Sequence, residues 1–454
     1  MELARLWRKR GKRQGVFFTV PSLRPIPLTS RAISDFLSGR KASDEQARQT
    51  AAKVITDVRT GGFEAVCAYS KKFDGLALTR KGALATREEM LEAGKSLSPA
   101  QRRAMLLMKK KIERFARVQK ASMGKVRLMG NDGETSLRFV PLERVGIYVP
   151  AGRAPLFSSL FMSAVPAGIA GAEEMVVCTP PQGDGRANPL ILAAAGMCGI
   201  EKVYKIGGAQ AIAAMSFGVE GLMAPCDVIC GPGNAYVSAA KQLVASHGVR
   251  IDVPAGPSEV LIVAGDDARP EFAAADMLAQ AEHGGDSAAI CICVSKAFAC
   301  RVEAELARQL ALLPEGSPAR ISIPKWGRLF VAKSMDGAFN AANMLAPEHL
   351  EIFGKDALKL AGTAKNAGAV FVETAEAFCD YGMSGGNHIL PTNSAARAWG
   401  GVSVQTFGKW MYEETLAGKA QANLAQACAL LARMEGLEAH ARAAEIRKGK
   451  GRRA

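Results

Sequence analysis

Apolar residues recur at helical spacing through the N-terminal part of the chain, between about residues 30 and 130. Steps of three and four residues are clearest at Ala51, Val54, Ile55 and Val58. Such spacing gathers apolar side chains on one face of a helix, which must be covered by a core. We therefore predict an all-helical opening section.

The pattern then changes to short β-branched runs bounded by glycine or proline, which alternate with alanine-rich helical segments. These runs predict strands at residues 145–149, 174–178, 202–206, 227–230, 259–263, 289–294 and 369–372. Alternation of buried strands and helices is typical of parallel βαβ units whose sheets are covered on both faces. The predicted fold class is therefore α/β.

Beyond Pro391 the strand pattern ends, and a long amphipathic run at residues 420–447 is interrupted only by Gly436. This run predicts a separate helical C-terminal tail. Its apolar face needs a covering surface, such as another subunit.

Composition excludes a disordered chain and a small disulfide-stapled one, because 48% of the 454 residues are hydrophobic and 22% are charged. The net charge of +15 is concentrated in basic runs at both ends of the chain. Such runs are usually solvated tails, so we expect no nucleic-acid partner.

The ten cysteines lie mostly inside apolar runs and show no CxxC pair or metal-finger spacing. They are typical of buried, reduced thiols. The longest uncharged window, residues 154–172, contains prolines and glycines that make it poor material for a membrane span, and the N-terminus lacks the pattern of a secretory signal. We expect a cytoplasmic protein with no membrane partner.

Two glycine-containing loops, at residues 206–210 and 230–236, follow predicted strands and open helical segments. Glycines at such places let backbone amides and a helix N-terminus approach a phosphate, as dinucleotide sites require. Neither loop is a GxGxxG, because Tyr236 stands at the last glycine position. An ordinary tight turn therefore fits as well as a dinucleotide loop.

Histidine is scarce, with five in the chain. Gln280 and His283 are three residues apart in a helical segment and can share a cation, although a surface hydrogen bond fits too. Glu348 and His349 are adjacent, which suits proton transfer near neutral pH. The structural alternative for this pair is a helix start after Pro347.

The remaining candidates lie late in the chain. His388 belongs to a loop at residues 385–392 that glycine and proline make irregular, and Asp380 precedes it closely. His440 lies in the helical tail, where a solvated position is its ordinary role.

Seven stretches of the chain resemble histidinol dehydrogenases and occur in that family's order. They are residues 145–153, 207–214, 231–235, 255–260, 280–283, 347–351 and 387–392. The resemblance covers roughly residues 30–447. It implies a zinc- and NAD-dependent oxidation of L-histidinol, through L-histidinal, to L-histidine, the last two steps of histidine biosynthesis.

The resemblance also implies roles for individual residues. Glu348 and His349 are the implied acid/base pair, with His349 taking the hydroxyl proton and Glu348 helping to activate water for the aldehyde step. The implied ligands of one zinc ion per subunit are Gln280, His283, Asp380 and His440. The implied dinucleotide contacts are Tyr148, Gln210 and Asn234. The implied substrate contacts are the four zinc ligands together with Ser258, His349, His388 and Glu435.

The family fold has two Rossmann-like α/β domains with parallel sheets, a helical N-terminal section and a C-terminal helical tail that is exchanged between the subunits of a homodimer. Glu435 and His440 would then complete the site of the partner subunit. The expected domains are a basic disordered tail (1–20), a first α/β domain (21–130 and 259–380), a second, NAD-side α/β domain (131–258), a small C-terminal dimerisation domain (381–446) and a basic tail (447–454).

The chain departs from the family pattern in three places. It has one residue more than usual between Asp380 and His388, and the stretches 61–63 and 409–416 are unlike the common versions. These differences concern substrate preference more than fold.

Two alternatives compete with this assignment. One is a related zinc/NAD dehydrogenase of another polar alcohol, such as a sulfonated diol. Glu348, His349 and Glu435 favour histidinol, because an anionic substrate would call for arginine. The other is a non-catalytic basic binding protein, which the retained metal and acid/base residues disfavour.

Overall fold

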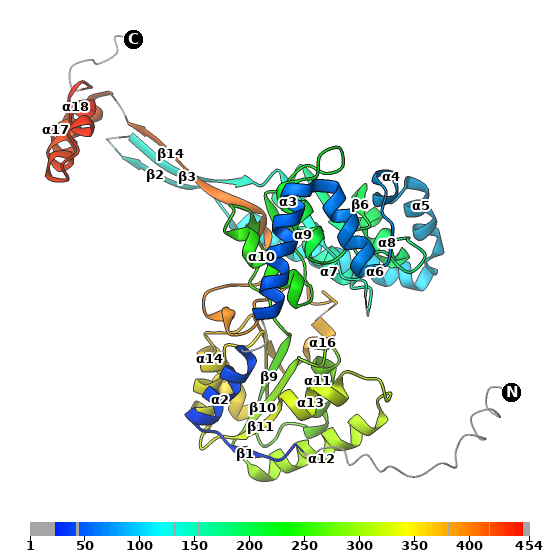
Figure 1. Ribbon diagram of the computed structural model, residues 1–454. Helices are drawn as coiled ribbons and strands as arrows, with labels where there is room; N and C mark the ends of the chain where they lie inside the picture. Colours follow the sequence, from blue (N-terminus) through cyan, green and yellow to red (C-terminus); the bar gives the residue numbers. More distant parts are fainter. Residues whose placement is uncertain are drawn as a thin grey trace. The chain divides into compact units, whose positions relative to one another are not determined.

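The computed structural model describes residues 23–41, 45–130, 133–152, 154–379, 381–416 and 418–447 (Figure 1). These residues divide into two compact units. Unit 1 comprises the described residues of Met1–Ala42, Gly256–Phe378 and Pro391–Trp399, and unit 2 those of Ser43–Ala255, Cys379–Leu390 and Gly400–Ala454. The basic tail expected at 1–20, most of the one expected at 447–454, and Asp380 lie outside the described residues.

A parallel sheet forms the centre of unit 1. Its order is β1 (Ile26–Pro27), β11 (Gly327–Val331), β10 (Ala288–Cys293), β9 (Glu259–Ala264), β12 (His349–Phe353) and β13 (Ala369–Val372). Strands β9, β10 and β12 are buried along their whole length, as expected for a parallel sheet with both faces covered. Strands β9, β10 and β13 confirm three of the predicted runs.

Helices cover both faces of this sheet (Figure 1). One apolar core contains side chains of α11, α12 and α13, and the other contains side chains of α2 and α14. The helices of the unit are α2 (Ser30–Lys41), α11 (Pro270–Ala281), α12 (Lys296–Leu312), α13 (Ala319–Trp326), α14 (Met335–Leu345), α15 (Lys355–Lys359) and α16 (Glu376–Cys379), with 3-10 turns η1 (Ala361–Thr363) and η2 (Ala395–Arg397).

Unit 2 contains a second parallel sheet. Its order is β6 (Lys202–Tyr204), β5 (Glu174–Cys178), β4 (Arg144–Tyr148), β7 (Val228–Cys230) and β8 (Arg250–Ile251). Four of these strands confirm predicted runs. The helices that follow its first four strands along the chain are α7 (Phe157–Ala170), α8 (Pro189–Met197), α9 (Gly208–Phe217) and α10 (Ala235–Ala245).

The opening helices also belong to unit 2. They are α3 (Glu45–Phe73), α4 (Arg80–Ala83), α5 (Arg87–Ser96) and α6 (Pro99–Ser122). Helix α3 packs beside α9 and α10, and the apolar positions that predicted it, including Ala51 and Val54, are buried there (Figure 1). This differs from the expected domain boundaries, which grouped residues 45–130 with the other sheet. Periodicity identifies a buried helix face but not the surface that buries it.

A small antiparallel sheet completes unit 2, in the order β14 (Gly408–Leu416), β3 (Gly133–Pro141) and β2 (Val126–Gly130). The prediction that no strand follows Pro391 is therefore wrong. Strand β14 is exposed from its second residue onwards and is stabilised by its backbone pairing with β3. Its sequence shows no alternation of apolar and polar residues from which a strand could have been predicted. The turn η3 (Val404–Phe407) precedes it.

The tail forms two helices, α17 (Gly418–Met434) and α18 (Glu438–Glu445), which pack against each other. Gly436 has φ +77° in the turn between them, which confirms the predicted break. Arg433 pairs with both Glu438 and Glu445 across the turn.

All ten cysteines are unpaired thiols, most of them buried or half-buried. Over the described part of the chain, no helix is both long and apolar enough to cross a membrane.

Candidate active site

The predicted acid/base pair lies at the start of β12, a central strand of unit 1. The chain leaves α14 through Ala346, which has φ +50°, and enters β12 at His349. The alternative of a helix start after Pro347 is therefore wrong. Glu348 and His349 keep only 6% and 4% of their surface exposed. Burial of two such groups is costly without partners, which makes this pair a strong functional candidate.

Ser258 and the first backbone N–H of β9 hold Glu348 in place. The Ser258 hydroxyl donates to Oε2 of Glu348 at 2.5 Å, and the backbone N–H of Glu259 donates to the same oxygen at 2.9 Å. Hydrogen bonds to a charged oxygen are worth about 1.5–3 kcal/mol each. The structure therefore brings together Ser258, Glu348 and His349, three residues for which the family resemblance implies a role in the site.

The ring of His349 is oriented by a hydrogen bond and by packing. Its Nδ1 lies 3.2 Å from the carbonyl oxygen of Glu259 and 3.6 Å from Oε2 of Glu348. Its ring also packs against Phe371, with ring centroids 5.8 Å apart. Because a carbonyl oxygen only accepts, Nδ1 carries the proton in its hydrogen bond to Glu259, and Nε2 is the basic nitrogen of the neutral ring.

Glu259 and Arg40 belong to the same buried group but were missed by sequence reasoning. Arg40 donates to the carbonyl oxygen of Pro257 at 3.0 Å and lies 3.6 Å from Oε2 of Glu259. Burial raises the pKa of Glu259 to about 7, against the opposing charge of Arg40. No local pattern could have revealed this pair, because more than two hundred positions separate its members in the chain.

The predicted dinucleotide residues lie around the strand ends of unit 2. The buried Tyr148 ends β4, and its hydroxyl accepts a hydrogen bond of 3.1 Å from the backbone N–H of Gly208, the first residue of α9. Burial raises the pKa of Tyr148 to about 12. The hydroxyl is therefore neutral at physiological pH.

Gln210, in the first turn of α9, is 1% exposed. Its Nε2 lies 3.5 Å from Oδ2 of Asp74, whereas its Oε1 is buried with no hydrogen-bond partner among the described residues. Burial raises the pKa of Asp74 to about 6. Asp74 follows α3 and carried no signal for a site in the sequence.

Asn234 and the second glycine loop lie between β7 and α10, as predicted. The Asn234 side chain caps α10 by accepting from the N–H of Val237. Gly231 has φ +110°, and a Cβ there would overlap the carbonyl oxygen of Tyr148, so this position requires glycine. The buried pair of Lys241 and Asp252 binds the Gly231 carbonyl and N–H respectively.

The predicted metal ligands are distributed over both units. Gln280 lies in the last turn of α11 and His283 just beyond it, in unit 1. The exposed His440 lies on α18 of unit 2, and Asp380 is not described. No three His, Cys, Asp or Glu side chains of the described chain gather into a metal-binding group.

The remaining predicted substrate contacts belong to unit 2. The half-buried His388 follows Asn387, whose amide donates to the carbonyl oxygen of Met162 at 2.6 Å. Glu435 is exposed in the turn between α17 and α18.

Comparison with known proteins identifies the family. The histidinol dehydrogenase family profile matches residues 37–448. Histidinol dehydrogenases from Xanthomonas axonopodis pv. citri and Bacteroides fragilis are 43% and 41% identical to the chain, and each alignment covers 89% of this chain and 93% of the relative. The chain belongs to the histidinol dehydrogenase family. This confirms the family that seven sequence stretches predicted, and with it an oxidoreductase.

A solved histidinol dehydrogenase structure has the same fold as this chain. The enzyme from Elizabethkingia anophelis superposes with a TM-score of 0.86 at 34% identity, covering 94% of this chain and 98% of that one. The predicted α/β class with parallel sheets is confirmed, with the small antiparallel sheet as an addition.

The environment of Gln280 fits the metal that histidinol dehydrogenases use. Its side chain is fully buried, yet neither Oε1 nor Nε2 has a hydrogen-bond partner among the described residues. An unsatisfied buried amide costs about 1–3 kcal/mol. A cation bound to Oε1 would offset part of that cost, so the residue type and its surroundings suit a ligand.

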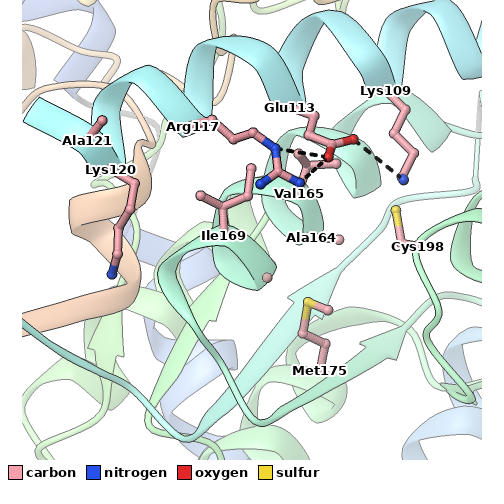
Figure 2. Close-up of a pocket in the computed structure, with 11 residues that line it drawn as sticks. Lys109, Glu113, Arg117, Lys120, Ala121, Ala164, Val165, Ile169, Met175 and Cys198 are labelled. Carbon is pink, nitrogen blue, oxygen red and sulfur yellow. Dashed lines mark hydrogen bonds and ion pairs between the residues drawn. The ribbon is translucent and has the colours of Figure 1, made fainter.

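A groove of about 570 Å³ between α6 and α7 is not part of this site (Figure 2). Its basic wall is already engaged: Lys109 and Arg117 pair with Glu113, and Lys120 donates to the Ala170 carbonyl oxygen. None of the residues predicted for the histidinol dehydrogenase reaction lines it.

Proposed function

We propose that the protein oxidises L-histidinol, through L-histidinal, to L-histidine and reduces two NAD⁺ in turn. These are the last two steps of histidine biosynthesis. The observation that carries the proposal is the buried group of Ser258, Glu348 and His349 in a chain of this family. It supplies the base, the acid and the hydrogen bonds that orient them.

His349 is the base for the first step. Nδ1 is oriented toward the Glu259 carbonyl, so Nε2 takes the hydroxyl proton while hydride leaves for the nicotinamide. Glu348, with two donors on Oε2, is held in place for the second step. There it helps to take a proton from the water that attacks the aldehyde, after which the second hydride leaves.

We infer that one zinc ion per subunit is held by Gln280, His283, Asp380 and His440. When bound, zinc supplies a Lewis-acidic centre that orients the amino and imidazole nitrogens of the substrate. These four ligands contact the substrate at the metal site. Four further residues contact it directly, namely Ser258, His349, His388 and Glu435. The unsatisfied amide of Gln280 supports this assignment.

We place NAD on unit 2, whose parallel sheet we interpret as a Rossmann-like domain. Tyr148, Gln210 and Asn234 lie at the loops that connect strands with α9 and α10, where backbone amides of a helix N-terminus bind phosphates. The sheet of unit 1 is the second Rossmann-like domain. The ten unpaired thiols support action in the cytoplasm.

We further propose a homodimer that exchanges the α17–α18 tail. Large apolar side chains on this tail are exposed, with 62% for Leu430, 60% for Leu431 and 76% for Met434, and they need a covering surface. Mixing His440→Ala subunits with His349→Ala subunits should restore activity, because one composite site then contains neither change. No rescue after subunit exchange would contradict the exchanged tail.

The decisive test is the stoichiometry of the reaction. Zinc-loaded protein is incubated with limiting L-histidinol and excess NAD⁺, and NADH is counted per histidinol consumed. We expect two NADH, loss of turnover on chelation and recovery with zinc. Absence of turnover by zinc-loaded protein would refute the substrate, and a panel of other polar alcohols would follow.

A further inference from the structure

Three acidic side chains of unit 1 lie together in the interior, outside the group that the mechanism uses. Glu351 is fully buried on β12, Asp276 on α11 is 8% exposed, and Glu376 at the start of α16 is 4% exposed. Burying three carboxyl groups together is expensive unless they are hydrogen-bonded. The proposed chemistry uses none of them.

Glu351 connects the other two elements to the strand. Its Oε1 accepts a hydrogen bond of 2.7 Å from the backbone N–H of Glu376. Its carboxyl group also interacts with that of Asp276, and Oε2 of Glu351 and Oδ2 of Asp276 have no other hydrogen-bond partner among the described residues. Because a carboxylate only accepts, a hydrogen bond between the two groups requires one retained proton. Burial raises the pKa of Asp276 to about 6 and that of Glu351 well above its usual range, in agreement with a retained proton.

Both connected elements lead to proposed zinc ligands. Asp276 lies one helical turn before Gln280 on α11, so the two side chains share a face of the helix. Helix α16 ends at Cys379, and the next residue in the chain is Asp380. Glu351 itself is two residues after His349 on β12.

We propose that Glu351 is a positioning residue for the metal site, because it connects α11, at Asp276, and the start of α16, at Glu376, to the strand that carries His349. The inference rests on the zinc site of the proposed function. Groups that orient metal ligands from behind typically change metal affinity 10–100-fold when they are removed. The connection through Glu351 acts on helices rather than on a ligand atom, so we expect about a 10-fold effect.

The test measures zinc affinity of the full-length protein by competition with a metal-binding dye, and thermal unfolding of the zinc-free protein. Glu351→Ala should weaken zinc binding about 10-fold. Glu351→Gln should stay close to wild type, because its amide accepts from Glu376 N–H and donates to Asp276. Glu351→Met, which fills the space without a hydrogen-bonding group, replaces the alanine variant if that variant does not fold.

Ile352→Ala is the matched control. Ile352 is the next residue of β12, is fully buried, and belongs to the core shared with α2 and α14. It should lower Tm while leaving zinc affinity unchanged. The role of Glu351 is refuted if Glu351→Ala or Glu351→Met, like the control, lowers only Tm. Failure of the wild type to bind one zinc would instead refute the proposed metal site, and this inference with it.

Discussion

The two parallel sheets carry their candidate residues in different ways. In unit 1 the group around β12 consists of buried ionisable side chains, namely Glu259, Glu348 and His349. In unit 2 the corresponding residues, Tyr148, Gln210 and Asn234, are uncharged and lie beside backbone amides. Proton transfer requires groups that change charge, whereas binding a dinucleotide requires dipoles that stay fixed. Substitutions should therefore affect turnover in unit 1 and cofactor binding in unit 2.

His349→Ala should show the largest effect, because it removes the proposed base. We expect kcat to fall by about 10²–10⁴-fold, while zinc content stays unchanged. NADH formation with L-histidinol measures it. His247→Ala is the control, since His247 packs edge-on against Phe217 in unit 2. A rate near wild type would exclude His349 from the mechanism.

Glu348→Gln should separate the two oxidation steps. The amide still accepts from Ser258 and Glu259, but it cannot take a proton from water. We expect oxidation of supplied L-histidinal to slow by about 10²-fold, and that of L-histidinol to slow less. Single-turnover rates with each substrate measure the difference. Equal slowing of both steps would contradict the proposed division of labour.

Glu259 makes the stability of unit 1 depend on pH. Its pKa is raised from 4.5 in the unfolded chain to about 7 in the folded state. Between these two pH values the folded state therefore binds more protons than the unfolded state. As the pH rises from about 4.5 to 7, this carboxyl group lowers the free energy of unfolding by a few kcal/mol. Glu259→Gln should flatten that part of the profile in denaturant titrations. An unchanged slope would mean that Glu259 is ionised throughout.

Tyr148→Phe, the substitution in unit 2, should have the smallest effect. Loss of the hydroxyl leaves the Gly208 N–H without its acceptor, which costs about 1 kcal/mol. If this cost falls on cofactor binding, KM for NAD⁺ rises roughly 5-fold, and kcat changes little. Tyr412→Phe on the exposed β14 is the control. A fall in kcat alone would assign Tyr148 to the chemistry.

The sequence predicted the sheets well where strands are buried on both faces, as in β9 and β10, because such strands are continuous apolar runs. It missed β12, because the polar residues His349 and Glu351 interrupt the apolar run of this strand. It also missed β14, which is held by pairing and not by burial. Patterning reports runs of apolar residues, so strands that polar residues interrupt and strands that are exposed escape it.

Candidates for the site could be predicted as far as single residues carry a local signature. Scarce histidines and their neighbours pointed to His349 and Gln280, and the family stretches supplied the rest. Arg40 and Asp74 were missed because their partners, Glu259 and Gln210, are far away in the chain. Such pairs exist only once the fold has brought distant segments together.

The order of segments along the chain also constrains how the protein is made. Strand β3 obtains one neighbour, β2, from the residues just before it, but the other, β14, comes from residues 408–416. During synthesis, one edge of the nine-residue strand β3 therefore stays unpaired until more than 260 further residues have been added. Unpaired edges invite aggregation. During translation, β3 therefore stays open to pairing with other chains until β14 has been made.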